Sequence, residues 1–241
     1  MYAVFNSRVL DPPFPNSRRS EVELTLDRTS NTLSKHLKSK GILPENYLQL
    51  RHGCIATKHE ADFLGAGTVV VTSTGSISNV EEVCELYNIN PTPRCTAELL
   101  LALYEKDFTD VYGDCSDQPM TAVSSCEGDF AFVIFDAASV YFLAARSASG
   151  AQRLFWGTSE DDEELVLLST DGDGLAEFPA GCLFESRGET TGRLENFTRH
   201  SPKRRWVNAL PTIDSHGHLR AVKYTTPSGT DLTSMVAKPT A

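Results

Sequence analysis

The segment CEGDFAFVIFDAASVYFLAARSASGAQRLFWG, from Cys126 to Gly157, decides the fold. Two runs of apolar residues, Phe130–Phe135 and Val140–Ala145, fill both alternating faces of two predicted strands. The short connection Asp136–Ser139 between them favours a turn, so the two runs predict a hairpin. An antiparallel hairpin usually keeps one polar, solvated face. Because both faces are apolar here, we expect the hairpin in a middle layer that is covered on both sides.

The two predicted faces of the first strand have different members. Phe130, Phe132 and Ile134 point to one side, and Ala131, Val133 and Phe135 point to the other. A layered sandwich with helices outside the sheets follows from this pattern.

Several motifs in and after the hairpin resemble one known family. They are Gly128–Asp136, Ala145-Arg146, Gly150 and Leu154–Gly157, and they are similar to class II glutamine amidotransferase domains, which are N-terminal-nucleophile (Ntn) hydrolases. These domains form the glutaminase part of asparagine synthetases. The resemblance implies an α+β fold: a four-layer αββα sandwich of two mostly antiparallel sheets flanked by helices.

Two later motifs resemble one branch of that family more closely. Phe178–Phe184 and Pro211–Gly217 are similar to segments of the aluminium-induced, stem-specific proteins of plants, which have the domain without the synthetase. The branch's YGL motif is Tyr87-Asn88-Ile89 here, and its LRDR motif is absent. The resemblance predicts one domain over residues 1–224 and a flexible, Ser/Thr/Pro-rich tail over residues 225–241.

Composition limits the function classes. The 241-residue chain has 40% hydrophobic residues, enough for one large core, and a formal charge of −10, which argues against nucleic acid or an anionic membrane as partner. We find no secretory signal and no run of about 20 apolar residues that could span a bilayer. Six scattered cysteines without CxxC spacing predict reduced thiols in a cytoplasmic protein.

The sequence predicts no cofactor and no metal. His216-Gly-His218 and Asp171–Gly174 are interpreted as turns, because neither has the further ligands that a zinc or calcium site requires. Lys203-Arg204-Arg205, a short basic run, is interpreted as a solvated turn.

Helical spacing predicts helices over Thr29–Lys40 and Thr96–Tyr104, and a third that begins at a capping box, Ser78–Glu81. Strands are expected over Met1–Val9, Arg51–Lys58 and Leu64–Thr72, and then over Leu165–Leu168, Leu183–Glu185 and Arg193–Phe197. The polar segment Thr109–Ser125 is expected to be a surface loop.

The resemblance implies a nucleophile at the start of the chain, where the α-amine serves as base for the side chain of the same residue. The catalytic members lose their methionine and begin with cysteine, whereas this chain has Tyr2. A phenol on a rigid ring cannot reach its own amine, and its usual pKa of about 10 keeps it protonated at neutral pH. We therefore expect Met1 to be retained, no propeptide to be removed, and the nucleophile to be missing.

Two further parts of the catalytic site are changed. The catalytic members build an oxyanion hole from Asn-Gly, where this chain has Thr74-Gly75; losing one such donor costs about 100- to 1000-fold in rate. Gly75 is explained equally by a turn with positive φ. The aspartate that binds the substrate amine is replaced by Thr96, and Glu98, which remains, is also explained by the helix dipole.

The arginine positions of this chain also differ from those of the catalytic members of the family. The carboxylate-binding Arg-Gly-Pro-Asp motif has no counterpart between Gln49 and Lys58. Arg146 is followed by Ser147 where the family has aspartate, so Arg146 is expected to be solvated or paired elsewhere.

These changes favour a non-catalytic binding or assembly module with protein partners, as a homo-oligomer or in a larger complex. Its vestigial pocket is predicted to consist of Tyr2, Thr74, Gly75, Thr96, Glu98 and Arg146. Two alternatives stay open: an amidase or glutaminase-like enzyme with another nucleophile, and a sensor that binds a small amino acid in the vestigial pocket.

Overall fold

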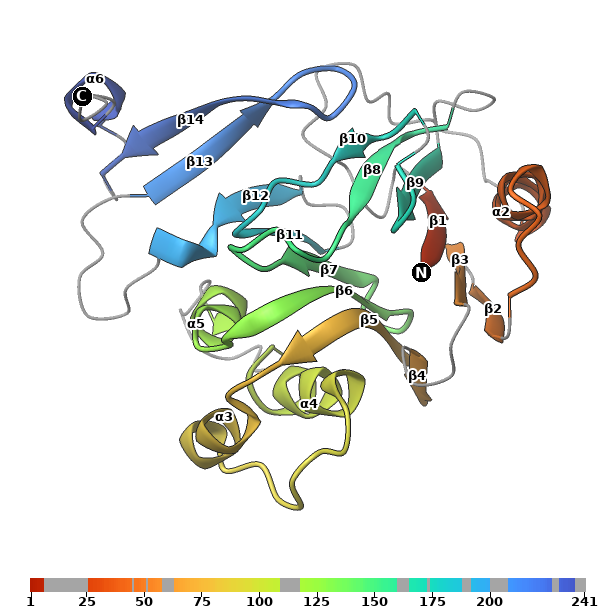
Figure 1. Ribbon diagram of the computed structural model, residues 1–241, viewed down its shortest axis with the longest axis horizontal. Helices are drawn as coiled ribbons and strands as arrows, with labels where there is room; N and C mark the ends of the chain where they lie inside the picture. Colours follow the sequence, from red (N-terminus) through yellow and green to blue (C-terminus); the bar gives the residue numbers. More distant parts are fainter. Residues whose placement is uncertain are drawn as a thin grey trace.

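The computed structural model describes residues 1–6, 26–44, 46–50, 52–57, 63–108, 118–159, 165–172, 174–187, 192–199, 208–226 and 230–236. Two six-stranded sheets stack face to face, and helices cover their outer faces (Figure 1). Every strand pair that the structure describes within these two sheets is antiparallel. The predicted four-layer α+β sandwich is therefore confirmed.

Sheet A contains the first strand near its centre. Its order is β10-β8-β9-β1-β3-β2, with β1 (Tyr2–Asn6), β2 (Asn46–Leu50), β3 (Gly53–Thr57), β8 (Phe155–Thr158), β9 (Leu165–Ser169) and β10 (Ala176–Glu177). The outer face of sheet A is covered by helix α2 (Leu26–Ser39).

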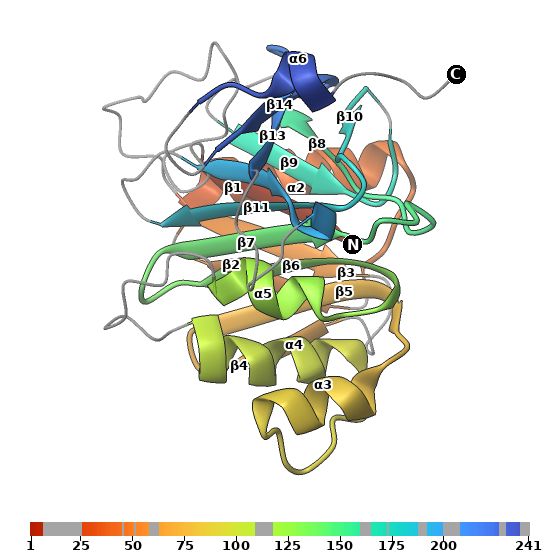
Figure 2. The same ribbon diagram turned by 90° about the vertical axis from the view of Figure 1, so that its left-hand side faces the viewer.

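Sheet B contains the central hairpin. Its order is β12-β11-β7-β6-β5-β4, with β4 (Phe63–Ala66), β5 (Val69–Ile77), β6 (Gly128–Asp136), β7 (Tyr141–Arg146), β11 (Cys182–Arg187) and β12 (Arg193–Asn196). Helices α3 (Val80–Tyr87), α4 (Thr96–Leu103) and α5 (Gln118–Ser124) cover its outer face, as Figure 2 shows from the side. A π-helical turn, η2 (Tyr104–Phe108), continues α4.

The remaining elements lie beyond these layers. A 3-10 turn, η3 (Phe197–Arg199), follows β12, and β13 (Asn208–Ile213) pairs with β14 (Leu219–Thr225) in a separate hairpin. A short helix, α6 (Thr233–Val236), contacts β14 within the predicted tail. The division of the chain at residue 224 stays a prediction.

The central hairpin occupies the middle of the sandwich, as predicted. Ala131, Val133 and Phe135 belong to the core between the sheets, together with Phe5 from β1. Phe130, Phe132 and Ile134 belong to the second core, under α3, α4 and α5. Each such buried large apolar side chain contributes about 1.5–3 kcal/mol to folding, so burying both faces of one hairpin couples the two cores.

Two predictions of secondary structure are wrong. The segment expected as a loop contains α5, because Met120, Ala122 and Val123 bury against sheet B while Pro119 is tolerated in the first turn of the helix. The strand expected over Leu64–Thr72 is two strands, because Gly67 has a φ of +59° and turns the chain between β4 and β5.

The expected capping box of α3 does not form. Asn79, not Ser78, is the N-cap residue, and its side chain makes no capping hydrogen bond. The Asn79 amide instead donates to the Ser125 carbonyl at 2.9 Å, and its oxygen accepts from the Glu127 N–H at 2.8 Å. Tertiary partners from the α5–β6 connection therefore replace the local cap.

Some predictions lie outside the described residues. The basic run Lys203–Arg205 is one of them, as are residues 109–117 of the expected loop. Within the described part of the chain, no helix is long and apolar enough to cross a membrane.

Candidate functional site

Gly75 is required by the backbone of β5. Its φ is +78°, and a Cβ at this position would overlap the carbonyl oxygen of Asp129 on the neighbouring strand β6. An L-residue there would meet both the unfavourable φ and a backbone atom that cannot move independently. The conformational explanation of Gly75 therefore applies.

Gln152 lies directly over this glycine, and sequence reasoning missed it. The position of a Cβ on Gly75 would be 2.6 Å from Gln152 Cγ and 2.8 Å from Gln152 Cδ. The Thr74 hydroxyl donates a hydrogen bond to Gln152 Oε1 at 3.1 Å. A glutamine side chain of the chain itself thus lies against the Thr74-Gly75 segment, and its loop carries no sequence signal for that contact.

Arg146 binds the same loop through backbone carbonyls. Its Nε donates to the Gln152 carbonyl at 2.7 Å, and its Nη2 donates to the Gly150 carbonyl at 2.6 Å. Its Nη1 donates to the Phe178 carbonyl at 2.8 Å, which ties the loop to the segment after β10. Arg146 is 4% exposed, and the planar guanidinium matches several acceptors at once.

The ion pair of Arg146 joins it to β10. Its Nη2 lies 2.7 Å from Glu177 Oε1, whose side chain is 60% exposed. Of the two possibilities left open for Arg146, pairing elsewhere is the one observed. Arg146 also lines a surface cavity of about 490 Å³, with Pro179 and His218 on its other walls.

Tyr2 lies on the opposite face of sheet A from this group. Its side chain is 2% exposed and packs with Leu33 and Leu37 of α2. Its hydroxyl donates to Asp171 Oδ2, and its ring centroid lies 6.0 Å from that of His36.

The alternation of β1 explains this placement. Met1, Ala3 and Phe5 face the core between the sheets, so Tyr2 and Val4 must face α2. The Met1 nitrogen donates to Thr170 Oγ1 at 3.2 Å, next to the partner of Tyr2.

Thr96 and Glu98 begin α4, in the outer helical layer. Glu98 accepts hydrogen bonds from the Arg94 backbone N–H at 2.6 Å and from Arg94 Nη2 at 2.7 Å. The hydrogen bond from the Arg94 side chain, followed by that from the Arg94 backbone, lowers the pKa of the Glu98 carboxyl. This arrangement satisfies a donor at the start of the helix, as expected from the helix-dipole explanation.

The structure therefore brings Thr74, Gly75 and Arg146 together through Gln152. It places the Tyr2 side chain on the outer face of sheet A and the Thr96–Glu98 pair in the helical layer outside sheet B. That these residues form a ligand-binding pocket stays a prediction.

Burial holds three of the described thiols in their protonated form. Burial raises the pKa of the Cys54, Cys126 and Cys182 thiols to about 12 in each case. A thiol is nucleophilic only as a thiolate, so these three are unreactive at neutral pH. The sixth cysteine, Cys115, lies outside the described residues.

The histidine pair forms a turn, as predicted. Asp214 Oδ1 accepts from the backbone N–H groups of His216 and His218, at 2.9 Å each, and Asp214 Oδ2 pairs with Arg220 at 2.6 Å. Across the residues that the structure describes, no three His, Cys, Asp or Glu side chains converge as metal ligands.

Sequence comparison finds similarity to a glutamine-dependent synthetase. A segment of 147 residues is 33% identical to a rice (Oryza sativa subsp. japonica) protein named asparagine synthetase [glutamine-hydrolyzing] 2. The segment is 58% of this chain but only 21% of the synthetase, so this chain matches about a fifth of its relative.

Two solved structures are also similar to this chain. The glutamine phosphoribosylpyrophosphate amidotransferase of B. subtilis has a TM-score of 0.47 at 14% identity, over 68% of this chain and 37% of that one. A glutamine aminotransferase class-II domain protein from silicibacter pomeroyi has a TM-score of 0.44 at 11% identity, over 82% and 91%.

The family itself is identified by a match along most of the sequence. Residues 4–226 match the family described as aluminium induced protein. The matched region runs from residue 4, within β1, through β12 and the β13–β14 hairpin. The chain therefore belongs to the aluminium-induced protein family.

Proposed function

We propose that this protein is a non-catalytic, glutamine-amidotransferase-like module that works by binding, as a subunit of a larger assembly. The observation that carries the proposal is the placement of Tyr2. Its phenol is buried against α2 and bonded to Asp171, on the face of sheet A that is remote from Thr74 and Arg146. A side chain in that position cannot attack an amide held between the sheets.

The surroundings of Thr74 support the same proposal. In a working glutaminase, donors must aim at the oxygen of the substrate amide, in a space that the substrate can enter. Here the Gln152 side chain occupies the space over Gly75 and bonds the Thr74 hydroxyl. The Cys54, Cys126 and Cys182 thiols supply no substitute nucleophile, because burial raises their pKa values to about 12.

The test is labelling with a glutamine analogue that carries an electrophilic group, combined with an assay for glutamate release. We expect no covalent adduct within the folded chain and no glutamate above the protein-free rate. The variant Tyr2→Cys is the more decisive test, because it introduces the cysteine thiol that the resemblance to class II glutamine amidotransferases implies at this position. Since position 2 faces α2, we expect Tyr2→Cys to stay inactive.

Two results would contradict the proposal. One is glutamate release that is lost when a single residue near Thr74 is changed. The other is glutaminase activity gained by Tyr2→Cys. To test the assembly part of the proposal, the protein is isolated from cells that express it at its natural level, and the mass of the native particle is measured. A monomer with no bound protein would reject this part.

A second candidate is amino-acid binding beside Thr74, favoured by one contact. The Thr74 hydroxyl already bonds an amide group, that of Gln152. Removing this internal group with Gln152→Ala vacates space for a free amide. Stabilisation of the parent chain by millimolar glutamine, with a larger stabilisation of Gln152→Ala, would support this candidate, and no stabilisation of the parent chain would reject it.

A further inference from the structure

A cavity of about 490 Å³ opens on the surface beside Arg146, where three connections between strands meet. The turn after β7 provides one wall, the connection from β10 to β11 provides the second, and the start of β14 provides the third. We call it the Arg146 cavity, and its walls include Arg146, Gly150, Glu177, Pro179, Ala180 and Leu219. Its volume lies within the range of about 300–1,000 Å³ that is typical of small-molecule sites.

The three walls are held in place by hydrogen bonds within the described chain. Arg146 joins the first two walls, because its side chain donates to the Gly150 carbonyl at 2.6 Å and to the Phe178 carbonyl at 2.8 Å. The third wall belongs to the β13–β14 hairpin, whose Gly217 carbonyl accepts from Trp156 Nε1 at 3.2 Å. A ligand that enters a cavity with fixed walls orders few protein groups, so little of its binding energy is lost to conformational entropy.

Arg146 keeps one donor for a ligand. Its guanidinium has five N–H groups. Within the described chain four acceptors bind them, which are the carboxylate of Glu177 and the carbonyls of Gly150, Gln152 and Phe178. The remaining N–H group is on Nη1, which has two N–H groups and donates to the Phe178 carbonyl alone. Since Arg146 is 4% exposed, a hydrogen bond to this guanidinium is little weakened by water.

Glu177 places an acceptor directly beside that donor. Its Oε1 lies 2.7 Å from Arg146 Nη2, and its side chain is 60% exposed. Within the described chain, Arg146 is the one group bonded to this carboxylate, so Glu177 Oε2 can accept from a ligand. Because the guanidinium and the carboxylate are in contact, one small ligand that reaches either of them also reaches the other.

The paired charges indicate a neutral ligand. An anion at Arg146 would lie next to the Glu177 carboxylate, and a cation at Glu177 would lie next to the guanidinium, so each would meet a like charge. His218 also lines the cavity, but its Nδ1 lies 3.4 Å from Asp214 Oδ1. A neutral group with an acceptor and an adjacent N–H meets no like charge, and it forms a charge-assisted hydrogen bond with each partner.

The other walls indicate a flat, partly apolar molecule. Pro179 and Ala180 line the cavity from the β10–β11 connection, and Leu219, which is 47% exposed, lines it from β14. The position of a Cβ on Gly150 would be 3.4 Å from both Ala180 Cβ and Arg146 Nη2, so the missing side chain leaves contact space beside the guanidinium. A planar ring has apolar faces for these walls and hydrogen-bonding atoms at its edge.

We propose that the Arg146 cavity binds a small, neutral, planar molecule with a carbonyl oxygen next to an N–H group, as in a lactam or a pyrimidinedione ring. The carbonyl oxygen accepts from Arg146, the N–H donates to Glu177, and the ring lies against Pro179 and Leu219. The cavity is not lined by Tyr2 or Thr74, so this binding is independent of the loss of catalysis and of the amino-acid candidate beside Thr74.

The experiment is a titration of the isotope-labelled full chain with two probes, followed by the backbone amide signals in NMR spectra. The lactam 2-pyridone has the carbonyl and the N–H, whereas N-methyl-2-pyridone has the same ring and oxygen without the donor. We expect 2-pyridone to shift the amide signals of Gly150, Ala180 and Leu219 in a saturable way. The N-methyl probe should bind at least about tenfold more weakly, because a hydrogen bond to a charged group is lost.

Two outcomes of this titration would overturn the proposal. Equal affinities of the two probes would show that no N–H donates to Glu177. Absence of saturable shifts at the three amides with millimolar 2-pyridone would show that the cavity is not a site for this class of molecule.

Two exposed alanines locate the binding. Ala180 lines the Arg146 cavity, and Ala148 on the neighbouring turn does not. Ala180→Leu fills the space beside the guanidinium, so we expect it to abolish saturable binding of 2-pyridone. Ala148→Leu should change the affinity by no more than about twofold, as expected for a surface substitution away from the ligand. Equal binding by the two variants would reject this location.

Two exposed carboxylates test the acceptor. An amide oxygen accepts a hydrogen bond less strongly than a carboxylate, so Glu177→Gln should weaken binding of 2-pyridone by about tenfold. Glu127→Gln, outside the cavity, should change it by no more than about twofold. Equal effects of the two variants would reject the role of Glu177. Unfolding curves of all four variants verify that the fold is kept.

Discussion

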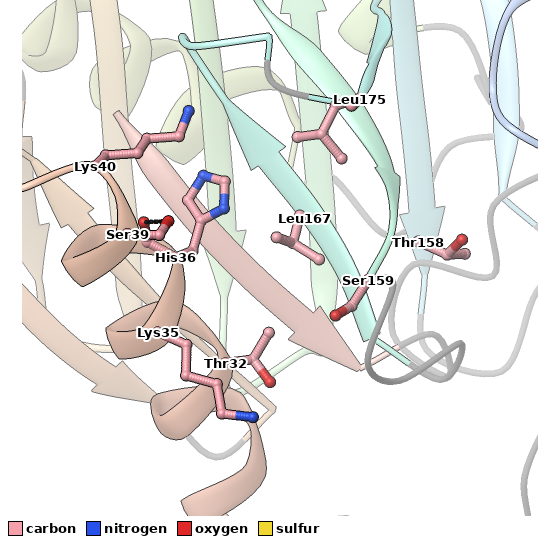
Figure 3. A pocket seen from close by; sticks show the side chains of 10 residues that line it. Thr32, Lys35, His36, Ser39, Lys40, Thr158, Ser159, Leu167 and Leu175 are labelled. Carbon is pink, nitrogen blue, oxygen red and sulfur yellow. Dashed lines mark hydrogen bonds between the residues drawn. The ribbon is translucent and has the colours of Figure 1, made fainter.

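Two regions of the molecule differ in how their polar groups are satisfied. Beside Thr74 and Arg146, the polar partners are groups of the chain itself: the Gln152 amide, three backbone carbonyls and the Glu177 carboxylate. Beside α2, basic and hydroxyl side chains surround a cavity of about 500 Å³ (Figure 3). The difference teaches that the polar side chains of Thr74 and Arg146, in the region identified by family resemblance, are bonded to groups of the chain itself, whereas a cavity with polar walls lies on the opposite face of sheet A.

The largest expected effect tests how tightly the region beside Thr74 is built. Gly75→Ala would force a Cβ into the Asp129 carbonyl oxygen and against Gln152 Cγ, at a residue whose φ is +78°. We expect a loss of about 4 kcal/mol in the free energy of unfolding, since neither the backbone φ nor the carbonyl can yield cheaply. Urea unfolding measures it.

A glycine in the neighbouring strand provides the control. Gly65 in β4 has open space around its Cβ position, so Gly65→Ala should change stability by no more than about 0.5 kcal/mol. If Gly75→Ala were equally mild, the region beside Thr74 would be open and adaptable, and the contrast between the two regions would fail.

The next effect tests the arginine that closes the loop. Arg146→Met keeps the volume of the side chain but leaves the carbonyls of Gly150, Gln152 and Phe178 without their donor. We expect a loss of about 3 kcal/mol, because unmet buried acceptors cost more than a hydrogen bond contributes on balance. Arg153→Met, at an exposed position of the same loop, should be nearly neutral, and similar losses in the two variants would contradict the role of Arg146.

The third effect tests whether the Cys126 thiol is shielded from water in the folded protein. Burial raises the pKa of Cys126 from 9.0 to about 12. Above pH 9 the unfolded chain therefore loses this proton while the folded chain keeps it, so the unfolded state binds fewer protons and the free energy of unfolding falls as pH rises. The fall is at most about 1.4 kcal/mol per pH unit for each such thiol, and it is absent below pH 9.

Cys126→Ala removes one titrating group from that window. Between pH 9 and 12, the stability of the variant should fall less steeply with pH than that of the parent chain, whatever its stability at pH 7. Equal slopes would mean that the Cys126 thiol is accessible to water. Chemical denaturation at several alkaline pH values provides the comparison.

The smallest effect concerns the hydrogen bond between Tyr2 and Asp171 on the outer face of sheet A. Tyr2→Phe keeps the ring against Leu33 and Leu37 and removes only the hydrogen bond to Asp171. We expect a loss of about 1 kcal/mol by thermal unfolding. Tyr47→Phe, which removes a hydroxyl bonded to Ser30 at an exposed position, should cost less, and the opposite order would contradict the assignment of Tyr2 to the buried layer.

The architecture could be predicted from the sequence because it depends on local alternation. Both faces of β6 and β7 are apolar over enough residues that only a middle layer can accommodate them. The start of α3 and the presence of α5 could not be predicted in this way. The Asn79 side chain forms hydrogen bonds with Ser125 and Glu127, which are distant in sequence. Helix α5 is stabilised by burial of its apolar residues rather than by its own polar sequence.

The candidate site was less predictable, since it depends on which strand face each residue occupies. Tyr2, Thr74 and Arg146 were grouped by resemblance, but the phase of β1 turns Tyr2 away from the other two. Gln152 acts only through contacts with residues distant in sequence, so it is not marked by its neighbours. The exception was Gly75, whose positive φ was one of the two explanations considered.

The central position of β1 has a consequence for how the chain folds. β1 pairs on one side with β3 and on the other with β9, so Tyr2 lies opposite Ser169. On the ribosome, the earliest segment must wait until most of the polypeptide has emerged before it can be enclosed. The strands β6 and β7 of sheet B can join much sooner, because the turn between them is short. Sheet B is thus suited to serve as the template on which sheet A closes.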